Sequence, residues 1–303
     1  MAPFPSPTKK WHDTTYPSLS PTRPELSAKG KTILITGGGT GIGAATAHSF
    51  AAAGASRIAL LGRRPQPLHD TKTSILQTYS SVSVSVYPTD VTNQSEVDTA
   101  FSDFLANTEN NKIDILVSNA ATIGPRDPIA TVNAPAFLAS IQQNLAGSLH
   151  IAQAFLRHAA PNATAISINS SAAHLNFAPL FAAYSVAKLA VFRLWDSFAF
   201  GSPDVSVFHV QPGVVDTDMN KEAGGVEAIG FSDDVSLPAT FNVWLASPEA
   251  RFLKGKFLWA NWDVDELKAN AKDLEASTKL NVGLVGWPFQ DAAWDFKPKV
   301  GNW

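Results

Sequence analysis

A tyrosine and a lysine stand close together in an otherwise apolar stretch, AAYSVAKLAVF, residues 182–192. If the stretch is helical, Tyr184 and Lys188 share a face, because positions i and i+4 lie one above the other. Lysine is almost never fully buried unless paired, so the plain interpretation puts Lys188 at the solvent edge with its stem over apolar surface. The alternative is acid–base chemistry, in which a nearby ammonium stabilises a tyrosinate and lowers its pKa from about 10 toward working pH.

A second candidate for chemistry is the glycine-rich segment TILITGGGTGIGAA, residues 32–45. It joins a β-branched run to a run of small residues, so a strand, a tight turn and a helix N-terminus follow one another. Backbone N–H groups and the positive end of a helix suit a pyrophosphate. An ordinary strand-to-helix turn also uses glycine for positive φ, but the complete strand–turn–helix context favours nucleotide binding.

The elements that must position these residues alternate between strands and helices. Apolar or alternating runs predict strands at 31–36, 57–62, 81–87, 113–119, 164–170, 205–210 and 256–260. Helical patterns lie at 44–54, 94–107, 135–159, 182–200 and 238–246, and another helix starts at Asp263 with Glu266 as its capping partner. Such alternation implies right-handed crossovers and a parallel sheet covered on both faces. The predicted fold class is α/β, with one Rossmann-type, doubly wound parallel sheet and helices on both faces.

The two ends of the chain differ from this regular middle. Residues 1–29 hold six prolines among polar residues, which indicates an extended N-terminal arm without a core of its own. Residues 30–280 are expected to form one domain, with a cofactor half at 30–218 and a substrate-lining part at 217–280. The tail, 281–303, either packs on the domain exterior or covers the mouth of the active site. Its large rings are Trp287, Phe289, Trp294, Phe296 and Trp303.

Composition excludes several classes of function. The 303 residues carry a net charge of −3, which offers no basic field for nucleic acid or an anionic membrane. The sequence has no cysteine, so disulfides, thiolate metal sites and cysteine nucleophiles are excluded, and no metal site is predicted. The N-terminus lacks the apolar region of a secretory signal, and no apolar run is long enough to span a bilayer. We expect a cytoplasmic protein.

Both chemical motifs resemble signatures of the short-chain dehydrogenase/reductase family. The glycine segment reads TGxxxGxG and the tyrosine–lysine pair reads YxxxK. Other family landmarks follow in order within residues 30–218, namely Asp90-Val91, SNAA at 118–121, Asn144, Ser171 and PGxxxT at 212–217. Asn119 is kept, whereas Ser118 and Ala121 depart from the family's NNAG. Ser171 is preferred to Ser170 because it stands 13 residues before the tyrosine, the family's usual interval.

The resemblance implies a nicotinamide-dependent enzyme. Tyr184 would be the proton donor, Lys188 would lower its pKa and bind the nicotinamide ribose, Ser171 would hold the substrate oxygen, and Asn144 would order a water. These four residues are the predicted catalytic set. The predicted cofactor contacts are Thr36, Gly37, Thr40, Gly41, Ile42, Gly43, Arg63, Asp90, Val91, Asn119, Ala120, Tyr184, Lys188, Pro212, Gly213, Val215 and Thr217.

The end of the second strand bears on the choice of cofactor. An enzyme that uses NAD would have an acid there to accept from the ribose 2′-OH. The sequence instead has Gly62 followed by Arg63 and Arg64, whose guanidinium groups suit a phosphate unless they are only solvated surface residues. Thr40 replaces the basic residue that some NADP-preferring relatives carry. NADP is therefore the predicted cofactor, with NAD possible.

The leading hypothesis is an NADPH-dependent reductase of a ketone or aldehyde, or the reverse alcohol dehydrogenase, acting on a small, hydrophobic organic molecule. The alternatives are an epimerase, dehydratase or enoyl reductase on the same scaffold, or a non-catalytic dinucleotide-sensing module. Loops 172–181 and 217–231 should line the pocket, and His174 is either a substrate contact or a loop residue with a backbone partner. Family members pair helices like 135–159 and 182–200, which predicts a homodimer or homotetramer. The segment FLWANWDVDEL resembles fungal reductases of specialised metabolism.

Overall fold

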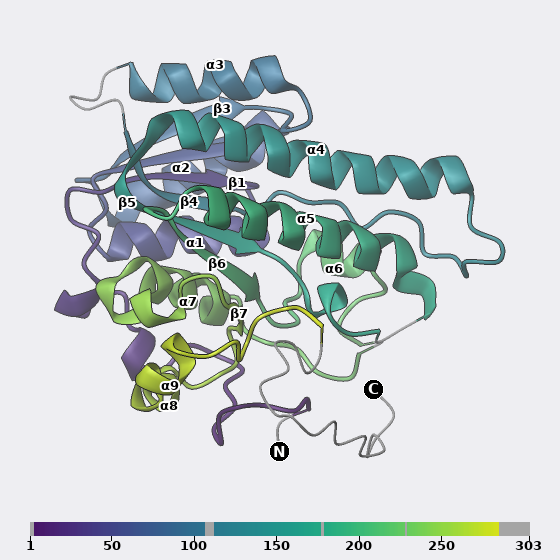
Figure 1. The fold of residues 1–303 in the computed structure, drawn as a ribbon. Helices are drawn as coiled ribbons and strands as arrows, with labels where there is room; N and C mark the ends of the chain where they lie inside the picture. Colours follow the sequence, from purple (N-terminus) through teal and green to yellow (C-terminus); the bar gives the residue numbers. More distant parts are fainter. Residues whose placement is uncertain (1–2, 107–111, 177–178, 228, 285–303) are drawn as a thin grey trace.

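A parallel β-sheet forms the centre of the computed structural model, which describes residues 3–106, 112–176, 179–227 and 229–284. Among these residues, seven strands hydrogen-bond in the order β3-β2-β1-β4-β5-β6-β7 (Figure 1). They are β1 (Thr32–Thr36), β2 (Arg57–Gly62), β3 (Ser83–Pro88), β4 (Ile113–Ser118), β5 (Ala159–Ile168), β6 (Ser206–Gln211) and β7 (Phe257–Trp259). The order reverses between β1 and β4, which confirms the predicted doubly wound sheet.

Helices cover both faces of this sheet. On one face α1 (Gly41–Ala52) packs against α2 (Pro65–Thr78) and α7 (Ser236–Ala246). On the other, α4 (Ala134–His158) packs against α3 (Gln94–Leu105) and α5 (Ala182–Gly201), three helices that Figure 1 shows in one layer. Central strands are therefore buried on both sides, as in β1, where every residue is buried.

Two hydrophobic clusters correspond to the two helix layers. The first includes Phe50 of α1 and Trp244 of α7, and the second includes Phe155 of α4 and Trp195 of α5. All four side chains have an exposed fraction of 0%. Trp195 thus belongs to the core of its own domain, and its side chain is not available to a partner subunit.

Helix α2 was not predicted from the sequence. Pro65 and Pro67 stand in its first turn, where a missing N–H is tolerated. Because proline usually interrupts a helix, the sequence pattern there does not indicate one. Its buried residues, Leu68, Thr71 and Ile75, recur at helical spacing and pack toward the sheet. All the helices and strands that were predicted are present, with ends that differ by a few residues.

The N-terminal residues pack along the C-terminal part of the domain. Short 3-10 helices η1 (Pro17–Leu19) and η2 (Pro24–Leu26) contact α7, and Leu19 and Leu26 are 0% and 2% exposed within the first hydrophobic cluster. Arg23 pairs with Glu249 at 2.7 Å. The remaining short elements are η3 (Ser171–Ala173), η4 (Pro179–Phe181), α6 (Asp218–Glu222), η5 (Pro248–Leu253), α8 (Val264–Ala269) and α9 (Ala271–Glu275).

Two further predictions concern the aromatic C-terminal tail and membrane-spanning helices. The five aromatic residues of the tail lie in 285–303, outside the described residues, so the two roles considered for them stay predictions. Within the part of the chain that the structure describes, no helix is long and apolar enough to cross a bilayer.

Candidate active site

The glycine turn between β1 and α1 brings backbone segments closer together than side chains would allow. Gly37 and Gly41 have φ values of +66° and +52°, in the left-handed region that favours glycine. A Cβ atom added to Gly43 would lie 2.1 Å from the carbonyl oxygen of Gly37. Thr40 is the N-cap of α1 in an extended conformation, and its side chain makes no capping hydrogen bond, while Ile42 stands in the first turn. The first turn of α1 thus lacks the side-chain cap that would compete with a pyrophosphate.

Thr36 and Asn119 fasten the ends of β1 and β4 together beside this turn. The Thr36 hydroxyl accepts hydrogen bonds from the backbone N–H groups of Asn119 (2.9 Å) and Ala120 (3.0 Å). The Asn119 amide donates to the Thr36 carbonyl at 3.0 Å. Thr217 comes from the loop after β6, and its methyl group would lie 2.9 Å from a Cβ on Gly41. Segments far apart in the sequence therefore meet at one edge of the sheet, as a dinucleotide site requires.

Asp90 and Val91 follow β3 and turn toward α4. The Asp90 carboxylate accepts from the backbone N–H and hydroxyl of Thr92 at 2.9 and 2.8 Å. These hydrogen bonds hold the pKa of Asp90 below its usual value, and the positive charge of Arg63 acts in the same direction. Val91 packs on α4 where Gly147 leaves room, since a Cβ there would be 2.7 Å from the valine side chain. The structure thus brings Arg63 near the residue predicted to flank the adenine.

The two arginines after β2 have different surroundings. Arg63 is exposed. Arg64 is also exposed, and its guanidinium lies 3.4 Å from the Asp218 carboxylate at the start of α6. With both partners about two thirds exposed (66% and 65%), this ion pair contributes little to stability. Gly62 is the last residue of β2, so the strand ends without an acid.

Tyr184 and Lys188 lie on the inner face of α5. Lys188 is 4% exposed, and its ammonium donates to the carbonyl oxygen of Ile168, at the end of β5, over 2.9 Å. The same nitrogen is 5.5 Å from the centre of the Tyr184 ring. The solvent-edge interpretation of Lys188 is therefore wrong, because the side chain is enclosed and paired with a backbone carbonyl.

Burial moves the pKa values of this pair apart. It raises the pKa of Tyr184 to about 12, a change that a hydrogen bond with Ser170 opposes. It lowers the pKa of Lys188 to about 8. In the protein alone, the tyrosine is thus further from proton exchange at neutral pH than a free tyrosine, so its use as an acid requires additional positive charge near the hydroxyl.

Both serines at the end of β5 lie at the site. The hydrogen bond to the Tyr184 hydroxyl comes from Ser170, which also caps η3 by accepting from the Ala172 N–H at 3.2 Å. Ser171 is 9% exposed and is held by its backbone N–H, which donates to the Gln211 side chain at 2.8 Å. The 13-residue interval cannot reveal this arrangement, since neighbouring serines differ only in where the turn after the strand directs them.

Asn144 connects α4 to the loop after β4. Its side-chain oxygen accepts from the Thr122 N–H at 3.0 Å, and its amide donates to the carbonyls of Thr122 (3.0 Å) and Ser140 (2.8 Å). The side chain therefore fixes the backbone that follows Asn119 and Ala120. Its predicted role in ordering a water stays a prediction.

The loop after β6 depends on a residue that sequence reasoning missed, Asp233. Its carboxylate accepts from the Val214 N–H at 2.6 Å, and Val215 forms a β-bridge with the same residue. Gly213, which follows Pro212, has a φ of +93°, and a Cβ there would be 2.5 Å from the Asp233 carboxylate. Burial raises the pKa of Asp233. No motif marks this aspartate, because it acts on a segment about twenty residues before it only after the chain has folded.

His174 has a side-chain partner. Its Nε2 atom accepts from the indole N–H of Trp259 at 3.2 Å, and its ring packs edge-on against Phe257 with centroids 4.8 Å apart. The side chain remains exposed on its other side. The histidine thus joins the loop after Ser171 to the end of β7.

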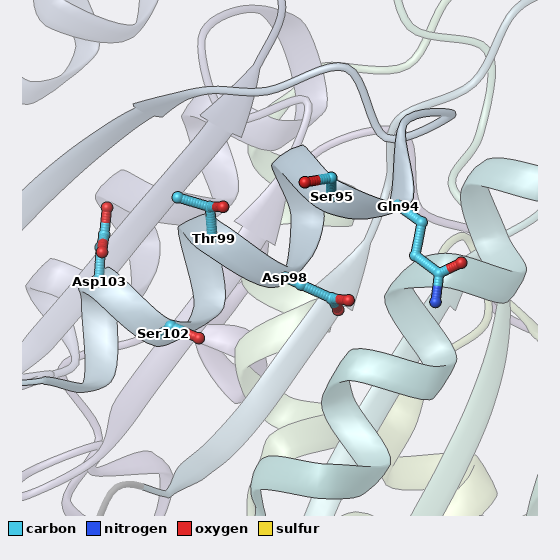
Figure 2. A pocket seen from close by; sticks show the side chains of 6 residues that line it. All are labelled: Gln94, Ser95, Asp98, Thr99, Ser102 and Asp103. Carbon is cyan, nitrogen blue, oxygen red and sulfur yellow. The ribbon is translucent and has the colours of Figure 1, made fainter.

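A surface hollow of about 620 Å³ lies elsewhere, along the outer face of α3. Figure 2 shows its lining side chains, all from that helix: Gln94, Ser95, Asp98, Thr99, Ser102 and Asp103. None of them belongs to the predicted site. Asp98 is engaged in an ion pair with Arg157. The hollow is therefore separate from the candidate active site, which lies at the carboxyl ends of the strands.

Known proteins similar to this chain in sequence and in fold identify its family. The family model described as short chain dehydrogenase matches residues 31–227. The short chain dehydrogenase/reductase AacuD of Aspergillus aculeatus is 32% identical, with 93% of this chain and 98% of that protein covered. One from Claviceps purpurea is also 32% identical, with 93% and 95% covered. A solved dehydrogenase/reductase from Sinorhizobium meliloti has a TM-score of 0.69 at 27% identity, over 80% of this chain and 97% of that one. The chain belongs to the short-chain dehydrogenase/reductase family.

Proposed function

We propose that this oxidoreductase uses NADPH to reduce a ketone or aldehyde of a small, hydrophobic organic molecule, or oxidises the corresponding alcohol, with Tyr184 as the proton donor. The observation that carries the proposal is the buried ammonium of Lys188, held by the Ile168 carbonyl at 2.9 Å and lying 5.5 Å from the centre of the half-buried Tyr184 ring. A lysine at the solvent edge of the helix would make neither contact.

In this proposal each residue has one task. The cofactor, when bound, supplies the hydride. Tyr184 donates its phenolic proton to the carbonyl oxygen as negative charge develops there, and a serine hydroxyl at position 170 or 171 holds that oxygen. Lys188 stabilises the resulting tyrosinate through its charge, and the Ile168 carbonyl fixes its ammonium. The pKa of Tyr184 is high even with Lys188 in place, so the proposal also needs the positive charge that an oxidised nicotinamide would bring to the site.

The cofactor would lie along the carboxyl edge of β1, β4 and β6. The glycine turn and the uncapped first turn of α1 fit a pyrophosphate, and Asp90, Asn119 and the loop 212–217 fit the nucleoside ends. Preference for NADP rests on Gly62 at the end of β2 and on the exposed Arg63, whose guanidinium suits a 2′-phosphate. The likeness to fungal short chain dehydrogenases supports a role in fungal specialised metabolism.

Two helices carry apolar side chains that the domain does not bury, which supports a homodimer or homotetramer. They are Leu138, Leu149 and Leu156 on α4 and Val186, Leu189 and Phe200 on α5, with exposed fractions from 38% for Leu149 to 93% for Phe200. Helices α4 and α5 are packed side by side, so these residues lie on one outer layer. A two-fold pairing of this layer would remove them from water.

The test is turnover of NADPH and NADH with a panel of bulky ketones, with products identified by mass spectrometry and Tyr184→Phe as the control. Formation of the alcohol, lost in the variant, supports the proposal. Reduction of a C=C bond, or conversion without net NADPH consumption, would instead assign the enoyl reductase or the epimerase or dehydratase alternative. Cofactor binding with no conversion of any ketone would favour the sensing module.

A further inference from the structure

The N-terminal segment 3–16 lies at the carboxyl end of β7, next to the predicted substrate loops. We propose that this segment is part of the substrate site, in which Phe4 and Trp11 form an aromatic wall that selects substrates with a flat, apolar ring system. The inference rests on the proposed function and adds specificity-determining residues to it. The family model begins at residue 31, so it does not include this segment.

The wall is a cluster of rings in edge-to-face and tilted contact. The Phe4 ring lies 5.1 Å from Trp259 and 6.0 Å from Phe231, and the Trp11 ring lies 5.9 Å from Trp259, measured between centroids. Trp259 is 4% exposed and forms the buried centre, whereas Phe4, Trp11 and Phe231 are only partly buried. The outer rings therefore keep apolar surface available for an aromatic ligand.

Hydrogen bonds connect this cluster to the proposed chemistry. Trp259 is the last residue of β7 and lies beside Gln211, whose side chain accepts from the Ser171 N–H at 2.8 Å. The indole of Trp259 also donates to His174, three residues beyond that serine. Phe231 follows α6 in the segment 217–231, which is predicted to line the pocket. The cluster thus borders the serine loop on one side and the loop after β6 on the other.

A chain of buried hydrogen bonds holds the segment in place. The His12 N–H donates to the Asn261 carbonyl at 2.9 Å, and the Asn261 amide donates to the His12 carbonyl at 2.8 Å. The same amide donates to Asp233 at 2.9 Å, and Asp233 accepts from Val214 in the loop 212–217. Asn261 and Asp233 are 1% and 5% exposed. A frayed terminus would not be tied by its backbone to the loop that is proposed to meet the nicotinamide.

Further contacts anchor the middle of the segment. The Glu266 carboxylate accepts from the backbone N–H groups of Lys9 (2.7 Å) and Lys10 (3.1 Å). Asp263 caps α8 by accepting from the Glu266 N–H at 2.9 Å. The predicted capping box is therefore only half formed, because the glutamate binds the N-terminal segment instead of the Asp263 backbone. These contacts place Trp11 on a fixed backbone, and Phe4 is held by its ring contacts with Trp259 and Phe231.

The proposal is tested with a Phe4→Ala/Trp11→Ala double variant of the full chain. Isothermal titration measures the affinity of its NADP⁺ complex, which cannot reduce a ketone, for 2-acetylnaphthalene and for cyclohexanone. We expect the wild type to prefer the naphthyl ketone, and the ratio of the two affinities to fall about tenfold in the variant, because two aromatic contacts that contribute beyond simple burial are lost. Phe4→Leu/Trp11→Phe should restore part of this ratio.

Tyr79→Ala is the matched control, because Tyr79 is a half-buried aromatic on the same hydrophobic cluster at the end of α2. It should lower the melting temperature and leave the affinity ratio unchanged. An unchanged ratio in the double variant, or a wild type without preference for the naphthyl ketone, would overturn the aromatic wall. Failure of the wild type to bind NADPH would instead overturn the proposed function, so the two failures are distinguishable.

Discussion

Replacing Lys188 with methionine should make the protein more stable and inactive. Lys188 is 4% exposed, and burial lowers its pKa from 10.5 to about 8. Since each pKa unit is worth about 1.4 kcal/mol, keeping the ammonium charged at neutral pH costs the folded state about 3 kcal/mol. Loss of its hydrogen bond to the Ile168 carbonyl offsets about 1 kcal/mol of that gain. Lys188→Met should therefore raise the free energy of unfolding by about 1–2 kcal/mol near pH 7.

The stability difference between the variant and the wild type should depend on pH. The unfolded chain binds a proton at Lys188 more tightly than the folded protein does, so between pH 8 and 10.5 the wild type gains stability as pH rises. Near pH 9.5, about 2 kcal/mol of the penalty has disappeared, and the advantage of the variant should vanish. The assay is urea unfolding of both proteins near pH 7 and pH 9.5, combined with kcat at saturating NADPH, which should fall by at least about 100-fold in the variant.

Lys272→Met is the control, because Lys272 is exposed on α9 and its replacement should change stability equally at both pH values. The reasoning is refuted if Lys188→Met is less stable than the wild type near pH 7, or if the stability difference is the same at both pH values. Either result would mean that the ammonium is compensated in the folded protein and that the pKa of Lys188 is not lowered.

Three other changes test the rest of the site. Tyr184→Phe should abolish turnover and leave the NADPH dissociation constant nearly unchanged, and more than about a tenth of wild-type activity would remove Tyr184 from the acid role. Arg63→Ala should weaken NADPH binding, measured by fluorescence titration, much more than NADH binding; equal losses would show that Arg63 does not contact the 2′-phosphate. Leu189→Glu, on the exposed face of α5, should yield monomers in light scattering if α4 and α5 form the subunit interface, whereas an unchanged oligomer would exclude that face.

The local features of this protein are readable in its sequence. Strand-to-helix alternation, the glycine turn and the Tyr184–Lys188 spacing depend on periodicity and backbone sterics within a few residues, and the predicted sheet and its helix layers are confirmed. Helix α2 was missed because the prolines in its first turn mask its buried face. The family resemblance supplied the site residues, whose roles stay proposals.

Contacts between distant parts of the chain were decided only by the tertiary structure. Whether Lys188 is solvated or enclosed depends on β5, whose last carbonyl accepts a hydrogen bond from its ammonium. How the serines after that strand are directed depends on distant contacts, such as the hydrogen bond from the Ser171 N–H to the Gln211 side chain. Asn261 meets His12 across 249 positions of sequence, and neither residue carries a local signal of the other. The physical reason is that a buried polar group must find a partner, and three-dimensional packing alone determines which partner is within reach.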